Sequence, residues 1–394
     1  MLSPIYIQAF ESISAVGLNR QLNKVLFDFT PSALSWQNTW THRPLRFGLV
    51  DDRLLLSKKQ ALEIFSELNS LTNAYGRTNQ LIATCLNSLR APLDRALKTY
   101  SPHRIGVIMG ASVSGMSEME RVYSNQDELN QTTDRILEIA NPAKFIASAL
   151  HLTGPTFVIS TACSSSSKAL ASAARLLQSD IIDFAICGGI DSASAFTLSG
   201  FDSLGALSHG QCQPFGANRD GINLGEGGAI FLLSREPSSY ELAGWSETSD
   251  GYHISSPDPL ATQVKKAMLD ALEMAKVDSV DYINAHGTGT IHNDAMEGLA
   301  IESVFTKSPP WVSSTKSLTG HTLGGAGALE AAICLLAMQT DRIPIHRLDS
   351  PIDKAFSKLK LALSPCSAKL GVTLSNSFAF GGNNAVLVFK KVTL

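Results

Sequence analysis

The sequence has few charged residues and no marked excess of either sign. Of its 394 residues only 17% are charged, and 32 Lys and Arg stand against 35 Asp and Glu, a formal net charge of -3. Proteins that bind nucleic acid usually carry a strong basic excess, so no nucleic-acid partner is expected. The hydrophobic share of 44% is too high for a disordered chain and allows a substantial core.

Cysteine is also scarce, and long apolar runs are absent. The six cysteines lie far apart and form no CxxC pair, which is typical of a reduced, cytoplasmic protein. The N-terminus lacks the features of a signal peptide. The longest apolar run, from Ala328 to Met338, is interrupted by Glu330 and is shorter than the ~20 residues that a membrane-spanning helix needs. We therefore expect a cytoplasmic location without membrane insertion.

Glycine, by contrast, is plentiful and clustered. Its 29 residues concentrate in the segments GGIDSASAF, NLGEGGAI, AHGTGT, GHTLGGAGALE and FGGNNAV. Such clusters mark tight turns or close backbone approach. They predict a crowded, buried site built from several loops.

Short β-rich runs alternate with segments of helical period. This alternation predicts an α/β architecture with mostly parallel sheets. In the first part, strands are expected at 104–110, 156–163, 183–189 and 227–234, with a helix at 164–179. In the second part, we expect helices at 262–275 and 325–339, strands at 281–287 and 310–316, and two strands joined by a glycine turn within 372–391.

The two parts resemble each other. In the first, a strand leads through Cys163 into a helix; in the second, a strand leads through Lys316 and His321 into a helix. Each also contains an apolar strand pair with a Gly-Gly step, which suggests duplicated halves. The Gly-Gly steps are Gly188-Gly189 and Gly381-Gly382, and the predicted halves are residues 1–238 and 239–394.

Cys163 is the first candidate for chemistry. It follows an apolar strand and comes just before a predicted helix, where unpaired N–H groups and the helix dipole favour a thiolate and lower the thiol pKa. The same backbone N–H groups could bind an oxyanion. The alternative is a buried structural cysteine, but the other five cysteines lack this position between strand and helix.

His286 and His321 each follow a predicted strand, where α/β proteins usually place their ligands. Neutral imidazoles there could donate hydrogen bonds to a developing oxyanion, although a lone histidine is more often structural. With Cys163 they could also bind zinc, but no two of the three are close in sequence and a fourth ligand is not evident, so no metal is expected. The glycine segments lack GK[ST], which argues against a nucleotide site.

The motifs together resemble one family. In order they are STACSSSSKAL, FAICGGID, NRDGINLGEGGAIFLL, NAHGTGT, SSTKSLTGHTLGGAGALE and NSFAFGGNNAVLVFKK. They are similar to the motifs of elongating β-ketoacyl-acyl carrier protein synthases of the Cys-His-His type, over at least residues 104–391. The resemblance implies a thiolase-like fold, in which two duplicated α/β halves form a five-layer αβαβα sandwich, usually dimerised across a sheet edge.

The resemblance also implies a decarboxylative Claisen condensation. Cys163 would accept an acyl group from acyl carrier protein, with the N–H groups of Cys163 and Phe380 as the oxyanion hole. His286 and His321 would then stabilise the enolate formed from malonyl-carrier protein, giving β-ketoacyl-carrier protein and CO2. The substrates are carried on phosphopantetheine of the carrier protein, and no cofactor of the enzyme itself is implied.

Further roles carry over by motif. Lys316 and Glu330 match a charged pair expected to organise the site and to orient His321, and Phe380 matches a gating phenylalanine of the acyl pocket. Thr288 and Thr290 match threonines that bind the phosphopantetheine arm. The remaining predicted substrate-binding residues are Phe378, Gly381 and Gly382.

The sequence departs from the family pattern at several places. Residues 20–100 match poorly, Asn383 replaces the threonine of the usual GGTN, and Lys168 follows the four serines after Cys163. These features look closer to synthases of aryl polyene or type II polyketide clusters. The expected partners are therefore acyl carrier protein and either a second copy of the chain or a homologous chain-length factor.

Three alternatives remain at this stage. A non-catalytic chain-length-factor-like subunit would commonly lack the nucleophile, which this chain keeps. A thiolase would carry a second catalytic cysteine in the C-terminal glycine loop, where this chain has phenylalanines. The segment Gly200 to Leu204 resembles the GxDSL site at which carrier proteins are modified, but it lacks the acidic helical context of a carrier.

Overall fold

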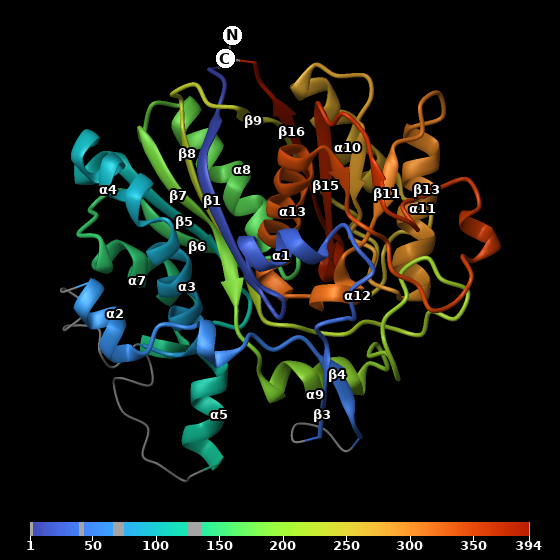
Figure 1. Ribbon diagram of the computed structural model, residues 1–394, viewed down its shortest axis with the longest axis horizontal. Coiled ribbons are helices and arrows are strands. Elements are labelled where there is room, and N and C mark those ends of the chain that lie inside the picture. Colours follow the sequence, from blue (N-terminus) through green and yellow to red (C-terminus); the bar gives the residue numbers. More distant parts are fainter. Residues whose placement is uncertain (1–2, 39–42, 66–74, 125–134, 394) are drawn as a thin grey trace.

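The computed structural model describes residues 3–38, 43–65, 75–124 and 135–393. A twelve-stranded mixed sheet runs through these residues in the order β13-β11-β10-β15-β16-β9-β1-β8-β7-β5-β6, with β2 paired to β1 (Figure 1). The first-half strands are β1 (Tyr6–Ser14), β2 (Gly17–Leu18), β3 (Ser35–Gln37), β4 (Leu45–Phe47), β5 (Ile105–Gly110), β6 (Thr156–Ile159), β7 (Phe184–Asp191) and β8 (Gly227–Ser234). The later strands are β9 (Tyr240–Ser249), β10 (Tyr282–Asn284), β11 (Trp311–Ser313), β12 (Arg342–Ile343), β13 (Lys360–Leu361), β14 (Cys366–Ser367), β15 (Val372–Ala379) and β16 (Asn383–Lys391).

Helices cover both parts of this sheet. In the first part they are α1 (Asn19–Val25), α2 (Lys58–Ile64), α3 (Arg77–Ser88), α4 (Arg90–Thr99), α5 (Met116–Ser124), α7 (Asn141–Ala149), α8 (Ser165–Gln178) and α9 (Ala195–Ser203). In the second they are α10 (Thr262–Ala275), α11 (Ile291–Val304), α12 (Lys316–Thr319) and α13 (Ala326–Thr340).

The same strand order occurs twice, as the duplication predicted. The first set is β1-β8-β7-β5-β6 and the second is β9-β16-β15-β10-β11. In each set the first three strands pair antiparallel and the last three pair parallel. The expectation of mostly parallel pairing was therefore wrong, because each half contains two antiparallel pairs beside its two parallel ones.

One detail of the predicted duplication was also wrong. Gly381-Gly382 lies in the turn between β15 and β16, whereas Gly188-Gly189 lies inside β7. The chain between β7 and β8 is instead a long excursion, residues 192–226, that includes α9. A Gly-Gly step alone does not distinguish a turn from a strand, because glycine is tolerated where backbones approach closely.

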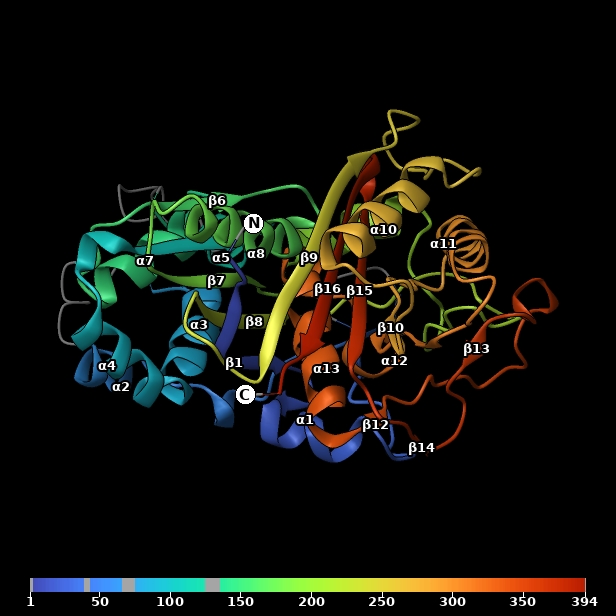
Figure 2. The ribbon, with the colours of Figure 1, turned by 90° about the horizontal axis from the view of Figure 1, so that it is seen from above.

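The side chains of the strands alternate between two layers of helices. On β5, Val107 and Met109 belong to the cluster with α3, α4 and α7, whereas Ile108 belongs to the cluster with α8 and α13. On β16, Leu387 faces α13 and Val388 belongs to the cluster with α10 and α11. The helices α8 and α13 thus lie between the two half-sheets, whereas α3, α4 and α7 cover the outer face of the first and α10 and α11 that of the second (Figure 2). This is the predicted five-layer sandwich.

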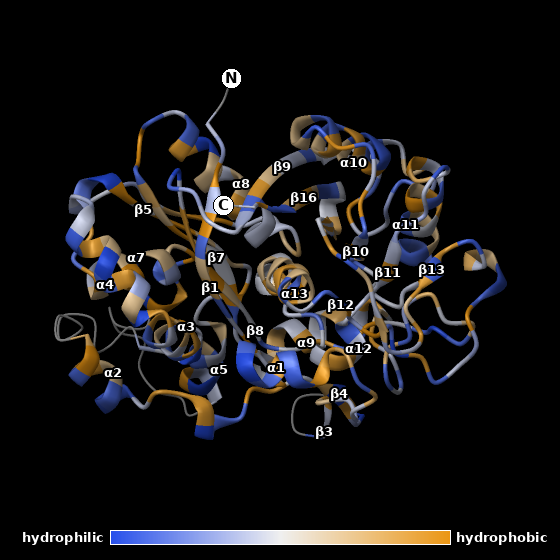
Figure 3. Cartoon of the chain, turned by 45° about the horizontal axis from the view of Figure 1, so that its top comes forward, coloured by the Kyte–Doolittle hydropathy of each residue, from blue (hydrophilic) through white to orange (hydrophobic). Residues whose placement is uncertain are grey.

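The central helix α13 explains the most apolar part of the sequence. The segment Leu323–Thr340 is long and apolar enough to cross a membrane, but 89% of it is buried inside the protein. Figure 3 shows this largely apolar helix surrounded by strands. It is the core helix around which both halves pack.

Candidate active site

A tight, strained turn places Cys163 at the centre of the molecule. Strand β6 ends at Ile159, earlier than predicted, and Ala162 adopts a left-handed conformation with φ of 52°. The Ser165 hydroxyl donates to the Ala162 carbonyl at 2.6 Å and accepts from the Thr161 N–H at 2.9 Å. These bonds hold a backbone conformation that non-glycine residues rarely adopt. The turn leaves Cys163, only 7% exposed, two residues before the start of α8.

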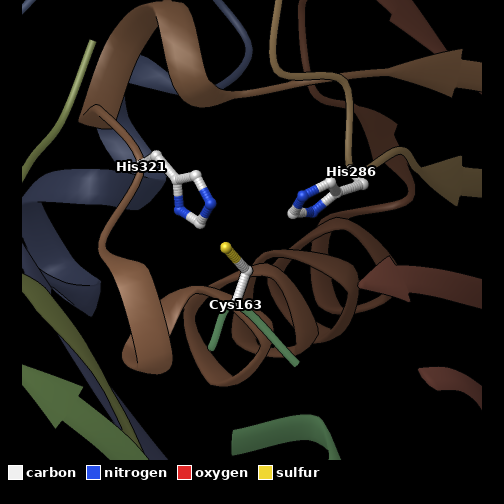
Figure 4. Close-up of side chains that lie close together, drawn as sticks. All are labelled: Cys163, His286 and His321. Carbon is white, nitrogen blue, oxygen red and sulfur yellow. The ribbon is translucent and has the colours of Figure 1, made fainter. Parts of the chain in front are cut away.

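Two histidines from the second half face this cysteine. His286 follows β10 and His321 follows α12, and Figure 4 shows all three side chains pointing toward one another. One ligand atom from each, the sulfur and two ring nitrogens, lie within 4.8 Å of one another. The imidazole ring centroids are 5.3 Å apart with an interplanar angle of 87°. The structure therefore assembles the three residues that the sequence selected.

The surroundings of His321 determine which ring nitrogen carries the proton. Its Nδ1 accepts a hydrogen bond from the Leu323 backbone N–H at 3.2 Å, so in the neutral ring the proton lies on Nε2. That Nε2 is buried and has no partner among the described residues. A buried, unpaired N–H donor is costly unless a ligand uses it. The arrangement is suited to donating a hydrogen bond to a substrate oxygen.

Lys316 and Glu330 form the predicted charged pair, and both are buried. The ammonium also donates to the His286 carbonyl and lies 3.4 Å from His286 Nδ1. Among the described residues the contacts of this pair go to His286, so the predicted role in orienting His321 stays a prediction. A lysine donor at Nδ1 leaves the proton of a neutral His286 on Nε2, as in His321.

Burial sets the protonation of the site. It lowers the pKa of His286 and His321 well below the usual range, and the Lys316 charge lowers both further. Burial raises the pKa of Glu330 to about 7 against the opposing effect of Lys316. Burial also raises the pKa of Cys163 to about 12, although Lys316 partly opposes this effect. The predicted low-pKa thiol was therefore wrong, because desolvation outweighs the charge beside it.

Two buried carboxylates that sequence reasoning missed hold the His286 loop. Glu297 accepts from the N–H groups of His286 at 2.8 Å and Gly287 at 2.7 Å. Asp294 accepts from the Thr288 N–H at 3.1 Å and the Gly289 N–H at 3.2 Å. Burial raises the pKa of Glu297 to about 7 and of Asp294 to about 6. The sequence did contain a signal for this role. Two acidic residues spaced i, i+3 lie on the helix that follows a glycine-rich loop, and the N–H groups of such a loop need acceptors when they are buried.

Cys163 borders two cavities. The first, about 320 Å³ in volume, contains both histidines together with Thr288 and Thr290. We call it the polar cavity after these side chains, although much of its lining is apolar. An apolar cavity of about 310 Å³ lies beside it and is lined by residues of α9. The sequence predicted an acyl pocket gated by Phe380 but did not place α9 in its wall, because nothing in the pattern of α9 distinguishes an exposed helix face from a cavity wall.

The phenylalanines lie where these two cavities meet. Phe380 and Phe201 line both cavities and stack with ring centroids 5.6 Å apart. Phe378 lines the polar cavity, as does Gly382. Gly381 does not line it; its N–H donates to the Ile254 carbonyl at 2.7 Å. The predicted substrate-binding role of Gly381 thus has no direct support from its position.

The Cys-His-His cluster also has the donors of a metal site. Sulfur and imidazole nitrogen are the ligands that zinc prefers, and their spacing would permit a shared ion. Among the described residues, the cluster contains no carboxylate or further cysteine as a fourth ligand. The prediction that no metal is used stays a prediction.

The sequence matches two family patterns along most of its length. The β-ketoacyl synthase N-terminal domain matches residues 83–238, and the β-ketoacyl synthase C-terminal domain matches residues 240–347. The chain is 34% identical to 3-oxoacyl-[acyl-carrier-protein] synthase 2 of Synechocystis sp., over 73% of this chain and 75% of that protein. It is 33% identical to nodulation protein E of Rhizobium meliloti, over 73% of this chain and 76% of that protein.

Solved structures agree with this result. The chain is similar to a complex of a ketosynthase with its chain length factor from Xenorhabdus doucetiae, with 35% identity and a TM-score of 0.90 over 99% of this chain and 98% of the other. A β-ketoacyl synthase from Burkholderia phymatum is 25% identical with a TM-score of 0.88, over 99% and 100% of the two chains. The fold is thus that of the thiolase-like ketosynthases. The chain belongs to the β-ketoacyl synthase family.

Proposed function

We propose that the protein is a β-ketoacyl-acyl carrier protein synthase that extends an acyl group by two carbons. The observation that carries this proposal is the buried, unpaired Nε2 of His321, which lies with His286 beside the Cys163 sulfur. Two neutral imidazoles that present N–H donors beside a nucleophile can stabilise a developing oxyanion. The similarity to 3-oxoacyl-[acyl-carrier-protein] synthases supports the same reaction.

The first step transfers the acyl group to the enzyme. The Cys163 sulfur attacks the thioester carbonyl of acyl-carrier protein, the new sulfur–carbon bond forms, and the carrier leaves as its thiol with the proton that Cys163 loses. A thiol pKa of about 12 keeps Cys163 largely protonated near neutral pH, so loss of this proton is part of the acylation step. The predicted oxyanion hole, the N–H groups of Cys163 and Phe380, would stabilise the tetrahedral intermediate.

The second step forms the carbon–carbon bond. Malonyl-carrier protein occupies the polar cavity with its thioester oxygen toward Nε2 of His286 and Nε2 of His321. Its carboxylate leaves as CO2, and the electron pair of the broken bond forms the enolate that these donors stabilise. The enolate carbon attacks the acyl carbonyl, the Cys163–acyl bond breaks, and β-ketoacyl-carrier protein is released. The sulfur leaves with the electron pair of that bond and takes up a proton, which restores the Cys163 thiol. Thr288 and Thr290 line the same cavity and suit contact with the phosphopantetheine arm.

The proposed partners are an acyl carrier protein and a second synthase-like chain. In the similar structure from Xenorhabdus doucetiae a ketosynthase is bound to its chain length factor, which supports a heterodimer with a homologous subunit. A ketosynthase that was solved in complex with its acyl carrier protein has the same fold as this chain. A cytoplasmic location and the absence of a cofactor belong to the same proposal. A chain-length-factor role for this chain is less well supported, because Cys163 and both histidines are assembled here.

Intact-protein mass spectrometry tests the proposal. Incubation with acyl-carrier protein should add the mass of the acyl group to wild type but not to Cys163→Ala, and malonyl-carrier protein should then remove it with release of β-ketoacyl-carrier protein. A panel of saturated, unsaturated and aryl acyl groups, with and without a co-expressed neighbouring subunit, identifies the starter. No adduct with any of them, or an adduct that survives Cys163→Ala, would overturn the assignment.

A further inference from the structure

The helix that follows Cys163 is bonded to the chain on both sides of Phe380. The hydroxyls of Ser167 and Ser377 share a hydrogen bond of 2.8 Å, and Lys168 Nζ donates to Asn383 Oδ1 at 2.9 Å. Ser377 lies three residues before Phe380, and Asn383 lies three residues after it. Two consecutive residues of α8 therefore bracket the turn that carries the phenylalanine.

These two bonds differ in how easily they can break. Ser167 and Ser377 are fully buried, so separating their hydroxyls would leave both unpaired in the core. Lys168 and Asn383 are only partly buried, and water can replace either group at the other. The serine pair is thus a fixed anchor, and the lysine–asparagine pair is the bond that can open.

Asn383 is directly connected to the conformation of the turn. It is the first residue of β16, where it pairs with Ala379 of β15. Its side-chain nitrogen Nδ2 also lies close to Gly381, because any side chain at position 381 would place its Cβ atom 3.2 Å from this nitrogen. Gly381 and Gly382 have φ values of 76° and 69°, a region that other residues rarely adopt. Two such glycines give the turn a wide choice of backbone angles. It is also held by two backbone hydrogen bonds, from the Gly381 N–H to the Ile254 carbonyl at 2.7 Å and from the Asp250 N–H to the Gly382 carbonyl at 2.9 Å, so a movement of the turn must carry or break them. Asn383 is the side chain closest to Gly381.

The turn matters because of where Phe380 lies. The stacked rings of Phe380 and Phe201 lie between the polar and the apolar cavity, and Cys163 borders both. A group that enters through the polar cavity and extends into the apolar one must move Phe380. A short group that remains at the sulfur need not do so.

We propose that the Lys168–Asn383 hydrogen bond is a latch that holds the Phe380 turn closed over the apolar cavity. Lys168 and Asn383 are then positioning residues that set how readily long acyl chains reach Cys163. The effect of the latch on acyl chain length rests on the proposed function, whereas its effect on the movement of the Phe380 turn does not. Opening it should favour long groups over short ones, because only long groups require Phe380 to move.

The test compares two alkylating reagents that need no carrier protein. The full-length chain is treated with iodoacetamide or with N-octyl iodoacetamide, and modification of Cys163 is followed by peptide mass spectrometry. In Lys168→Met the rate with the octyl reagent should rise relative to that with iodoacetamide by about fivefold, the factor expected for loss of one ordinary hydrogen bond. In Asn383→Asp the same ratio should fall, because a carboxylate holds the ammonium more tightly.

Three variants separate a latch from general destabilisation. Lys168→Arg keeps a donor and should behave like wild type, and Lys307→Met, a change at an exposed lysine, should leave the ratio unchanged. In the Lys168→Met background, Asn383→Asp should lose its effect, because the pair is already broken. An unchanged octyl-to-acetamide ratio in Lys168→Met, or an equal change with both reagents, would overturn the latch.

An assay with acyl-carrier proteins distinguishes failure of the latch from failure of the proposed function. Acylation by octanoyl- and acetyl-carrier protein should show the same change in ratio in Lys168→Met. Failure of wild type to accept any acyl group would overturn the proposed function, while the alkylation ratio would still decide the latch.

Discussion

The backbone N–H of Leu323 donates to Nδ1 of His321, so a residue two positions away determines which nitrogen of the imidazole carries the proton. Leu323 itself adopts a left-handed conformation with φ of 53°. The N–H group of Leu323, held in this conformation, keeps the proton of a neutral His321 on Nε2 without a side-chain partner. The tautomer of His321 is thereby a product of backbone geometry.

The His321 donor should matter chiefly in the second half-reaction. His321→Ala should slow malonyl decarboxylation by ~10²-fold to 10³-fold, the usual cost of removing one oxyanion donor. His321→Gln should retain more activity than His321→Ala, because its amide N–H can reach a position similar to that of Nε2. CO2 release from malonyl-carrier protein measures this step. Equal rates in wild type and His321→Ala would contradict the assigned role.

The pKa of Cys163 predicts its reactivity as a function of pH. With burial raising the pKa to about 12, the thiolate fraction should rise about tenfold per pH unit across the alkaline range. Iodoacetamide modification of Cys163 should therefore increase from about pH 8 to 10 without reaching a plateau. Site-specific mass spectrometry separates it from the partly exposed Cys366. A plateau below about pH 8 would instead indicate the low-pKa thiolate that the sequence predicted.

Glu297 should act by holding the His286 loop. In Glu297→Gln, one amide N–H would face the backbone N–H of His286 or Gly287, so an acceptor is lost and two donors oppose each other. We expect a loss of about 1–3 kcal/mol in the free energy of unfolding. Malonyl decarboxylation should also fall, with a smaller effect on the acylation of Cys163.

A residue on the same helix provides the control for this experiment. Glu302 lies on α11 with its carboxylate 3.9 Å from Lys358 Nζ, away from the loop. Glu302→Gln should leave decarboxylation unchanged. Urea denaturation measures the free energy of unfolding of both variants. If the decarboxylation rate falls by a similar factor in both, the effect of Glu297→Gln is not specific to the loop.

Metal removal should have no effect on the reaction. Although the cysteine and histidine atoms are close enough to share an ion, the proposed attack needs a sulfur that is free to bond to carbon. Dialysis against EDTA should leave acylation and condensation rates unchanged, and elemental analysis should find substoichiometric zinc. A stoichiometric metal whose removal abolishes acylation would contradict the predicted mechanism.

Local periodicity was sufficient to predict many elements. The helix expected at 262–275 occurs at those bounds as α10, and the strand expected at 227–234 occurs as β8. Both signals depend only on neighbouring residues. Strand direction and pairing depend on where distant segments meet, which is why the antiparallel pairs and the position of Gly188-Gly189 within β7 were missed.

The site shows the same limit. Sequence motifs were enough to select Cys163, His286 and His321, which the structure brings together. They did not reveal that Lys316 contacts His286, because side-chain direction depends on the packing of α12 against the loop. Lys168 and Asn383 were noticed only as departures from a pattern, and their contact joins positions 215 residues apart in sequence.

The burial of α13 has a consequence for how the protein is made. The nucleophile belongs to the part of the chain that leaves the ribosome first, whereas the histidines and α13 come later. Until α13 arrives, the face of α8 and the first half-sheet that it will cover presents a broad apolar surface to water. Such a surface invites aggregation or chaperone binding during translation. Expression of the first half alone should consequently yield insoluble protein. Coexpression of the second half, which supplies α13, should restore its solubility.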